Sequence, residues 1–299
     1  MQSLRVVCFG ETLWDLLPTG KVPGGAPMNV ALHLHRMAAQ VALVSRVGQD
    51  PAGDELLTYL HAHGLDTQHI QQDAQHGTGI VEVDMRDPSE VRYEIVQPVA
   101  WDYIEADAGA LAQAAACDAL VFGSLAARQA GSRQALDALL DATRGLVVFD
   151  VNLRPPFVDR SQIEHLLRRA GYAKLNEHEV RVLGAWAGAD EEAEEEALVR
   201  AVQTHYGLRA IILTQGAQGA SFWDGARLVS QPGYAVQVAD TIGSGDSFLA
   251  AFLSRHLRGY GIQDSLDYAC ATGALVASHR GANPPISEAD IQALIAARR

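Results

Sequence analysis

The chain has few cysteines, few aromatic residues and a shortage of positive charge. Its 299 residues contain three cysteines, Cys8, Cys117 and Cys270, and 6% aromatic residues. Because the cysteines are far apart and odd in number, neither a disulfide framework nor a zinc cluster is expected. Lys and Arg number 23 against 36 for Asp and Glu, so the net charge is −13. Since nucleic-acid binding needs an excess of positive charge, we expect no nucleic-acid partner.

Long apolar runs are also missing. No stretch approaches the ~18 apolar residues that are needed to cross a bilayer. The N-terminus, MQSLRVVCFG, lacks the apolar core and cleavage site of a signal peptide. Hydrophobic residues make up 48% of the chain and charged residues 20%, which is typical of a soluble globular protein. We therefore expect a cytoplasmic enzyme without a membrane partner, long enough to bury a sizeable core.

Three common motifs of enzyme chemistry are absent. The Gly-Lys pair at 20–21 is followed by valine, so the phosphate-binding GxxxxGK[ST] loop is missing. No GxGxxG follows the first predicted strand, which argues against a dehydrogenase, and no GxSxG marks a hydrolase nucleophile. His33 with His35, and His61 with His63, are predicted on helices, where residues two apart point to different sides. We interpret both pairs as surface histidines rather than metal ligands.

Strand and helix patterns alternate along the chain, which predicts an α/β fold with a central, mostly parallel sheet flanked by helices. Strands are predicted at residues 5–9, 42–46, 119–122, 146–150, 172–175 and 210–214. Helices are predicted at residues 28–38, 54–63, 132–142, 161–169, 192–203, 247–258 and 265–280.

Two segments interrupt this alternation. Residues 12–17 have a strand pattern and lead into a Gly/Pro-rich stretch at 18–27, and residues 79–83 and 91–96 have the alternation of a hairpin. They predict a small β unit made of two insertions, which serves as a lid that excludes water or as a clasp for a homodimer. The predicted boundaries are 11–25 and 78–102 for this unit, and 1–10, 26–77 and 103–299 for the main domain.

A glycine-rich turn precedes an amphipathic helix near the C-terminus. The sequence Asp240-Thr-Ile-Gly-Ser-Gly-Asp246 leads into a helix with Phe248 and Phe252 one turn apart. Such a turn presents free backbone N–H groups and the positive end of the helix dipole, which suit anionic oxygens. Asp246 is then either the N-cap of the helix or a base that takes a proton from a hydroxyl attacking phosphorus.

A second turn, Gly24-Gly25-Ala-Pro27-Met-Asn29, precedes the first predicted helix. Proline suits the first turn of a helix, so Asn29 is expected in that turn with its amide exposed at the helix start. The two glycines allow a ligand to approach the backbone closely. The alternative is a plain turn with a capping residue.

Together the two motifs resemble the signatures of the ribokinase/PfkB family of sugar kinases, and Gly10-Glu11-x-x-x-Asp15-x-x-Pro18 is similar to the fructokinase branch. The resemblance covers essentially the whole chain. It implies a ribokinase-like fold with a small β-sheet lid. It also implies ATP-dependent phosphorylation of a sugar primary hydroxyl, namely D-fructose to fructose 6-phosphate, with ATP as co-substrate and Mg²⁺ and K⁺ as cofactors.

The resemblance also implies roles for individual residues. Asp246 matches the family's catalytic base, and the N–H groups of Gly243, Ser244 and Gly245 would form an anion hole for the transferring phosphoryl group. Position 244 is usually alanine in the family. The implied sugar-binding residues are Asp15, Gly24, Gly25, Asn29 and Arg154. The implied nucleotide-binding residues are Asn176, Thr214, Gly216 and Gly219.

Two further matches concern metal ions. Asn176-x-x-Glu179 resembles a family motif for magnesium and phosphate, although the same pair also makes a capping box after the strand predicted at 172–175. Because Mg²⁺ keeps several waters, Glu179 is expected to act partly through water. Asp240 with residues 278–287 resembles the monovalent-cation site of several relatives.

Other interpretations stay open at this level. Arg154, in Asp150-x-Asn152-x-Arg154, could instead be a surface arginine held by Asp150, and the glycines at 216 and 219 could form an ordinary turn. A kinase of the same family for 2-keto-3-deoxygluconate or ribose is the nearest alternative. Aromatic residues near the β unit leave a nucleoside kinase open, and arginines there leave a phosphosugar kinase open. These residues are Trp14, Tyr93, Trp101, Tyr103, Arg86 and Arg92. A non-catalytic sugar- or nucleotide-binding regulator is the remaining alternative.

Overall fold

The computed structural model describes residues 3–17, 20–84, 92–190 and 192–298. In these ranges nine strands form the larger sheet, in the order β13-β12-β11-β10-β9-β8-β1-β4-β5. The strands from β11 to β5 are parallel, and β12 and β13 add an antiparallel edge. Their bounds are β1 Arg5–Phe9, β4 Gln40–Gly48, β5 Ile70–Asp73, β8 Ala119–Gly123, β9 Leu146–Asp150, β10 Tyr172–Asn176, β11 Ala210–Thr214, β12 Gly219–Trp223 and β13 Leu228–Pro232. The predicted, mostly parallel sheet is confirmed.

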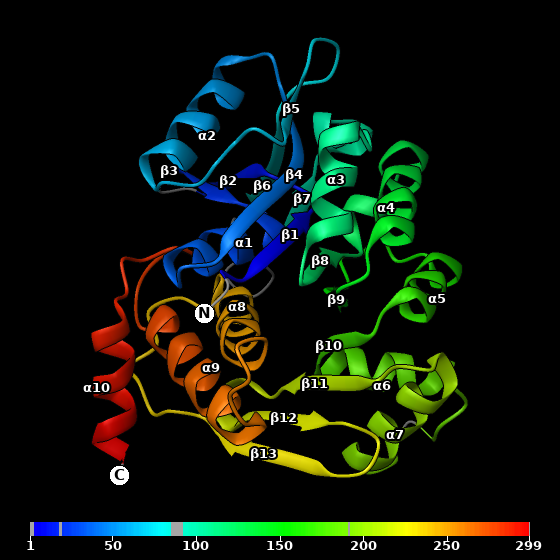
Figure 1. The fold of residues 1–299 in the computed structure, drawn as a ribbon, viewed down its shortest axis with the longest axis vertical. Helices are drawn as coiled ribbons and strands as arrows, with labels where there is room; N and C mark the ends of the chain where they lie inside the picture. Colours follow the sequence, from blue (N-terminus) through cyan, green and yellow to red (C-terminus); the bar gives the residue numbers. More distant parts are fainter. Residues whose placement is uncertain (1–2, 18–19, 85–91, 191, 299) are drawn as a thin grey trace.

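Helices cover both faces of this sheet (Figure 1). Successive residues of a strand point to opposite faces, so Val7 and Phe9 of β1 belong to one apolar core and Val6 and Cys8 to the other. The first face carries α3 Ala108–Ala116, α4 Ala130–Ala142, α5 Arg160–Arg169, α6 Glu177–Trp186 and α7 Glu195–Tyr206. The second carries α1 Ala26–Arg36, α2 Pro51–Ala62, α8 Ser244–His256, α9 Ile262–Ala277 and α10 Glu288–Arg298.

The predicted elements are all present, with ends displaced by a few residues. The prediction missed β5, β12, β13, α3 and α10, gave only the capping box at the start of α6, and started α8 and α9 three residues too late. The missed strand β5 has the sequence IQQD, and the missed helix α3 is mostly alanine, so neither has a clear apolar period. In the described part of the chain, no helix is long and apolar enough to cross a membrane. All three cysteines are buried and unpaired, as expected.

The smaller sheet has the strand order β3-β2-β6-β7. Its strands are β2 Leu13–Leu17, β3 Gly20–Gly24, β6 Gly79–Asp84 and β7 Arg92–Ile95. The predicted hairpin is confirmed, since β6 and β7 are antiparallel, and β2 joins it in parallel to β6. Strand β3 was not predicted, because its Gly/Pro-rich sequence has no strand pattern. The turn at 85–91 lies outside the described residues. All four strands fall inside the two predicted insertions, whereas the division into domains stays a prediction.

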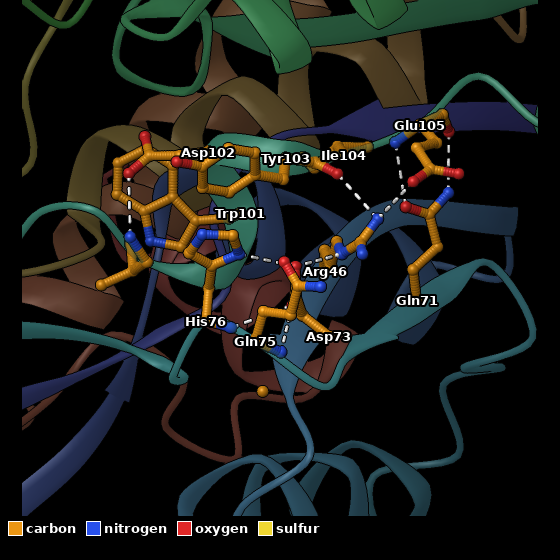
Figure 2. Close-up of polar contacts among 12 residues, drawn as sticks. Arg46, Gln71, Asp73, Gln75, His76, Trp101, Asp102, Tyr103, Ile104 and Glu105 are labelled. Carbon is orange, nitrogen blue, oxygen red and sulfur yellow. Dashed lines mark hydrogen bonds and ion pairs between the residues drawn. The ribbon is translucent and has the colours of Figure 1, made fainter.

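A cluster of polar side chains fixes the two connections that join the β6–β7 hairpin to the main sheet (Figure 2). Arg46 of β4 pairs with Asp73 at 2.8 Å and donates from Nη1 to the carbonyl oxygen of Tyr103 at 2.9 Å. Asp73 also accepts from the backbone N–H of His76 at 2.9 Å, and the rings of His76 and Tyr103 stack with their centroids 3.8 Å apart. The chain that enters β6 and the chain that leaves β7 are thus held at one place on the main sheet.

Candidate functional site

The glycine-rich turn before α8 has the geometry of an anion site. Gly243 is the N-cap of α8, and its φ of 75° lies in the left-handed region that favours glycine. A Cβ at Gly243 would also lie 2.5 Å from the Cα of Ala282. The first turn of the helix follows at Ser244, Gly245 and Asp246. The N–H of Ser244 donates to the Thr241 carbonyl at 3.2 Å, so the predicted anion hole would depend more on the N–H groups that follow.

Asp246 lies in the first turn of α8 but is not its N-cap, so the capping interpretation is wrong. Its Oδ2 instead accepts a hydrogen bond from Asn29 Nδ2 at 2.8 Å. Burial first, and then the nearby Asp150 carboxylate, raise the pKa of Asp246 to about 6, while Lys174, the Asn29 hydrogen bond and Arg154 each act to lower it. A carboxylate with this pKa is mostly ionised near neutral pH and is still basic enough to take a proton.

The start of α1 supplies the partner of Asp246. Asn29 is buried, with 4% of its surface exposed, so the predicted exposed amide is wrong. Its Nδ2 faces Asp246, and its Oδ1 accepts from Asn283 Nδ2 at 2.7 Å. Gly25 is the N-cap of α1, with φ of 113°, and a Cβ there would lie 2.3 Å from the Glu11 carbonyl oxygen. The backbone conformation and the close approach of the Glu11 carbonyl therefore require glycine at position 25 even without a ligand.

Two further acidic side chains lie near this pair. Asp15 projects from β2 over Gly24, where a Cβ would come within 2.2 Å of Asp15 Oδ2. Glu11 is 3% exposed, and its Oε2 has no hydrogen-bond partner among the described residues. Burial raises the pKa of Asp15 to about 6 and that of Glu11 to about 7, and the Asp246 carboxylate contributes to both increases. Glu11 was part of the opening motif but had no predicted role, because sequence does not reveal an unpartnered oxygen.

Arg154 lies at the exposed rim of the same region. Its charge lowers the pKa of Glu11, Asp15 and Asp246, so it lies near all three. Its Nη1 donates to the adjacent Leu153 carbonyl at 3.2 Å. The alternative that Asp150 holds Arg154 is wrong, because the Asp150 carboxylate pairs with a different cation.

That cation is Lys174, which no motif had singled out. Its Nζ donates to both carboxylate oxygens of Asp150, at 2.9 and 3.0 Å. The two side chains are 10% and 6% exposed. A Cβ on Gly245 would lie 3.4 Å from Lys174 Nζ, so the ammonium lies directly under the first turn of α8. The signal in the sequence was a lysine inside the strand YAKLN, because a buried lysine requires a partner.

Asn176 and Glu179 form the predicted capping box. Asn176 Oδ1 accepts from the Glu179 N–H, and Glu179 Oε2 accepts from the Asn176 N–H, both at 2.9 Å. Glu179 Oε1 accepts from the Leu153 N–H at 2.9 Å, so both oxygens bind backbone donors. Among the described residues, no group of three or more His, Cys, Asp or Glu could hold a metal ion. Both Glu179 oxygens are thus engaged by the backbone, and a magnesium role for Glu179 through water stays a prediction.

The β11–β12 connection contains the other predicted nucleotide-binding residues. Thr214 ends β11, and its Oγ1 donates to the Leu175 carbonyl at 3.2 Å. Gly216 has a φ of 53° and open space around it. Gly219 begins β12, and a Cβ there would lie 2.0 Å from the Gln231 carbonyl oxygen. Hairpin packing thus accounts for Gly219, and nucleotide binding at this connection stays a prediction.

Asp240 connects the turn before α8 to the chain after α9. Its Oδ1 accepts from the Ile242 N–H at 3.0 Å and its Oδ2 from the Gly281 N–H at 3.1 Å. His33 supports the same region: its side chain donates from Nε2 to the Ala282 carbonyl at 2.9 Å. The predicted surface position of His33 is therefore wrong, since only 4% of it is exposed.

Three of the four aromatic residues that kept a nucleoside kinase open are engaged within the protein. Trp101 is completely buried under the Arg128 guanidinium, and Trp14 is 7% exposed. Tyr103 is stacked on His76. Residue 86 and the side chains at 92 and 93 lie outside the described part of the chain.

Sequence and structure comparisons show which known proteins the chain resembles. The chain matches the pfkB family of carbohydrate kinases over residues 5–289. It is 30% identical to a fructokinase of Escherichia coli over 305 aligned positions, covering 94% of this chain and 95% of the relative. A fructokinase double mutant of Vibrio cholerae O395 with bound fructose, ADP and potassium superposes with a TM-score of 0.83 at 26% identity, covering 98% of both chains.

An ATP-bound fructokinase from Xylella fastidiosa has the same fold, with a TM-score of 0.85 and 98% coverage of both chains at 22% identity. The family match and the relative from Escherichia coli each extend over nearly the whole chain. The chain therefore belongs to the pfkB family of carbohydrate kinases.

Proposed function

We propose that the protein is an ATP-dependent sugar kinase that converts D-fructose to fructose 6-phosphate. The observation that carries the proposal is the Asp246 carboxylate, which Asn29 orients at 2.8 Å beside the glycine-rich start of α8. This arrangement combines a proton acceptor with a site for anionic oxygens. Family membership supports the reaction class, and the fructokinases among the similar proteins support the acceptor.

In this reaction Asp246 takes the proton of the C6 hydroxyl of fructose, while the oxygen of that hydroxyl bonds to the γ-phosphorus of ATP. The bond between that phosphorus and the bridging oxygen breaks, and ADP leaves with the bond's electron pair. The helix dipole and the N–H groups at the start of α8 stabilise the developing negative charge, and Lys174 lies beneath them. A magnesium ion, when bound with ATP, neutralises charge on the phosphates.

The sugar is held on the side of Asp246 that faces β2. The Asp15 carboxylate can accept hydrogens from two hydroxyls, and Gly24 leaves the space for that carboxylate. The Asn29 amide keeps one N–H and one lone pair after its contacts with Asp246 and Asn283, so it can still bind a hydroxyl. Arg154 at the rim supplies a positive charge for sugar or phosphate oxygens.

The surroundings of the site extend the proposal. The small sheet serves as a lid over the sugar, because Asp15 belongs to its strand β2. In this proposal the same sheet also forms the contact of a homodimer. Both Asp240 oxygens keep a lone pair beside their N–H contacts, which fits a potassium ion near the chain after α9. The use of ATP is consistent with the cytoplasmic location that the composition favours.

A sugar screen tests the proposed function. With ATP and Mg²⁺, ADP release should be fastest with D-fructose among fructose, glucose, ribose, 2-keto-3-deoxygluconate, fructose 6-phosphate and a nucleoside. A phosphorus–carbon NMR coupling should place the new phosphate on C6. A preference for another acceptor would replace fructose by that acceptor in the proposed function. If none of the acceptors led to ADP release, the result would favour a non-catalytic regulator.

Asp15→Ala should raise the KM for fructose more than tenfold while leaving the KM for ATP nearly unchanged. The lost hydrogen bonds to a charged group are worth roughly 1.5–3 kcal/mol. Initial-rate kinetics with each substrate varied in turn would measure both constants. Glu55→Ala, which removes a half-exposed carboxylate on α2 that pairs with Lys21, is the matched control. A shift in the ATP constant without one in the fructose constant would contradict the assignment.

A further inference from the structure

One face of α1 holds the chain that follows α9, here called the 281–284 segment. Asn29, His33 and Arg36 are four and three residues apart, so they share a face of the helix. His33 and Arg36 donate to three successive backbone carbonyls of the segment, at 2.9, 3.1 and 2.9 Å. Asp240 accepts from the N–H of Gly281 at 3.1 Å. The backbone of the segment is therefore fixed from both sides.

The side chain of Asn283 extends this network to Asp246. Asn283 Nδ2 donates to Asn29 Oδ1 at 2.7 Å, and Asn29 Nδ2 donates to Asp246 Oδ2 at 2.8 Å. An amide has a donor end and an acceptor end, so the end that faces Asn283 decides which end faces Asp246. A donor from Asn283 thus selects the orientation in which Asn29 offers an N–H to the carboxylate. In the opposite orientation, the Asn29 oxygen would face a negative charge.

We propose that Asn283 is a positioning residue for phosphoryl transfer, which acts through the Asn29 amide on the Asp246 carboxylate. The inference rests on the proposed role of Asp246 as the base. The contacts of His33 and Arg36 fix the backbone that carries this side chain, whose Oδ1 has no hydrogen-bond partner among the described residues. Asn283 lies in the stretch 278–287 that the resemblance linked to a monovalent cation, but its contact with Asn29 spans 254 positions, so the sequence offered no signal for this positioning role.

Other charged groups also act on Asp246. They are Asp150 on β9, Lys174 on β10, Arg154 after β9, Glu11 after β1 and Asp15 on β2. Because Asn283 reaches Asp246 through Asn29, its substitution leaves these groups in place. An N–H donated to a carboxylate favours the charged form, so loss of the Asn29 contact moves the titration of Asp246 to higher pH.

A double-mutant cycle tests the proposal. Asn283→Ala should lower kcat with saturating fructose and ATP about tenfold, and the low-pH limb of kcat/KM should move to higher pH. In an Asn29→Ala background the same substitution should change kcat less than about twofold, because the amide it orients is gone. A purely structural role would instead lower kcat by the same factor in both backgrounds, or lower the melting temperature by the same number of degrees in both.

Asn283→Asp sharpens the test at constant size. Its carboxylate accepts from Asn29 Nδ2, which turns the Asn29 oxygen toward Asp246, so kcat should fall further than in Asn283→Ala. Should Asn283→Asp fail to fold, Asn283→Ser retains a donor and should keep more activity than Asn283→Ala. An active parent whose kcat and pH profile are unchanged by Asn283→Ala overturns the inference alone. A parent without kinase activity toward any sugar overturns the proposed function and this inference with it.

Discussion

Asp246→Asn should lower kcat by about 10²–10⁴-fold in a protein that remains folded. Asparagine keeps the shape of the side chain and can still accept from Asn29 Nδ2, but it cannot take a proton. The loss corresponds to roughly 3–5 kcal/mol of activation free energy. Because Gly243 rather than Asp246 is the N-cap, no capping hydrogen bond is lost. Steady-state kinetics and thermal unfolding would measure the two effects separately.

The matched control is Asp264→Asn. Asp264 occupies the same place in the first turn of α9 that Asp246 occupies in α8, and it is exposed. Both substitutions remove a negative charge near a helix N-terminus, which is worth about 0.3–1 kcal/mol of stability. Asp264→Asn should therefore leave kcat unchanged. A folded Asp246→Asn protein that keeps more than about a tenth of the parent kcat would refute the base assignment.

The pH profile of the parent provides a second readout for Asp246. The pKa of about 6 belongs to the folded protein, and only the ionised carboxylate accepts a proton. The value of kcat/KM should therefore be full above that pKa and fall as pH drops through it. Residual activity of Asp246→Asn should keep only the part of this limb that comes from Asp15, whose pKa is also about 6.

Lys174→Met should destabilise the fold by about 3–5 kcal/mol. The substitution removes the cation that neutralises Asp150 and leaves a side-chain carboxylate that is 6% exposed without its partner. It also removes the positive charge below the first turn of α8, so kcat should fall about tenfold or more at temperatures where the protein is still folded. Urea unfolding would give the stability and initial rates the activity.

A second substitution separates the two effects of Lys174. In Lys174→Met/Asp150→Asn neither side chain carries a charge, so much of the lost stability should return. The kcat should stay low, because no positive charge remains under the turn. If Lys174→Met costs less than about 1 kcal/mol, the buried ion pair is not the strong local constraint that its geometry indicates.

Local patterns were sufficient to predict much of the fold. Alternating strand and helix periods predicted the parallel sheet, because those periods follow from backbone geometry and from which face is buried. The β6–β7 hairpin was predicted for the same reason. Strand β3 and strand β13 were not predicted, because their short sequences show no period of their own. Each pairs with the strand directly before it in the chain.

The glycine motifs illustrate where sequence alone stops. They indicated a turn before each of two helices, but whether Asp246 caps the helix or faces another residue depended on where α8 begins. The contact of Gly243 with Ala282 and the hydrogen bond from Asn29 settle that point in the fold. Similarly, Gly25 is explained by the Glu11 carbonyl, which no local pattern reveals.

By itself, the sequence determined the α/β class, the β6–β7 hairpin and the glycine-rich turns before α1 and α8, since all of these depend on neighbours along the chain. The tertiary structure alone decided the groups around Asp246. Asn29 lies 217 positions from Asp246 and 254 from Asn283, and Lys174 lies under a turn from another element. Such groups meet only after the sheet and helices pack. Their burial and hydrogen bonds, and hence the acidity of Asp246, are therefore properties of the folded chain.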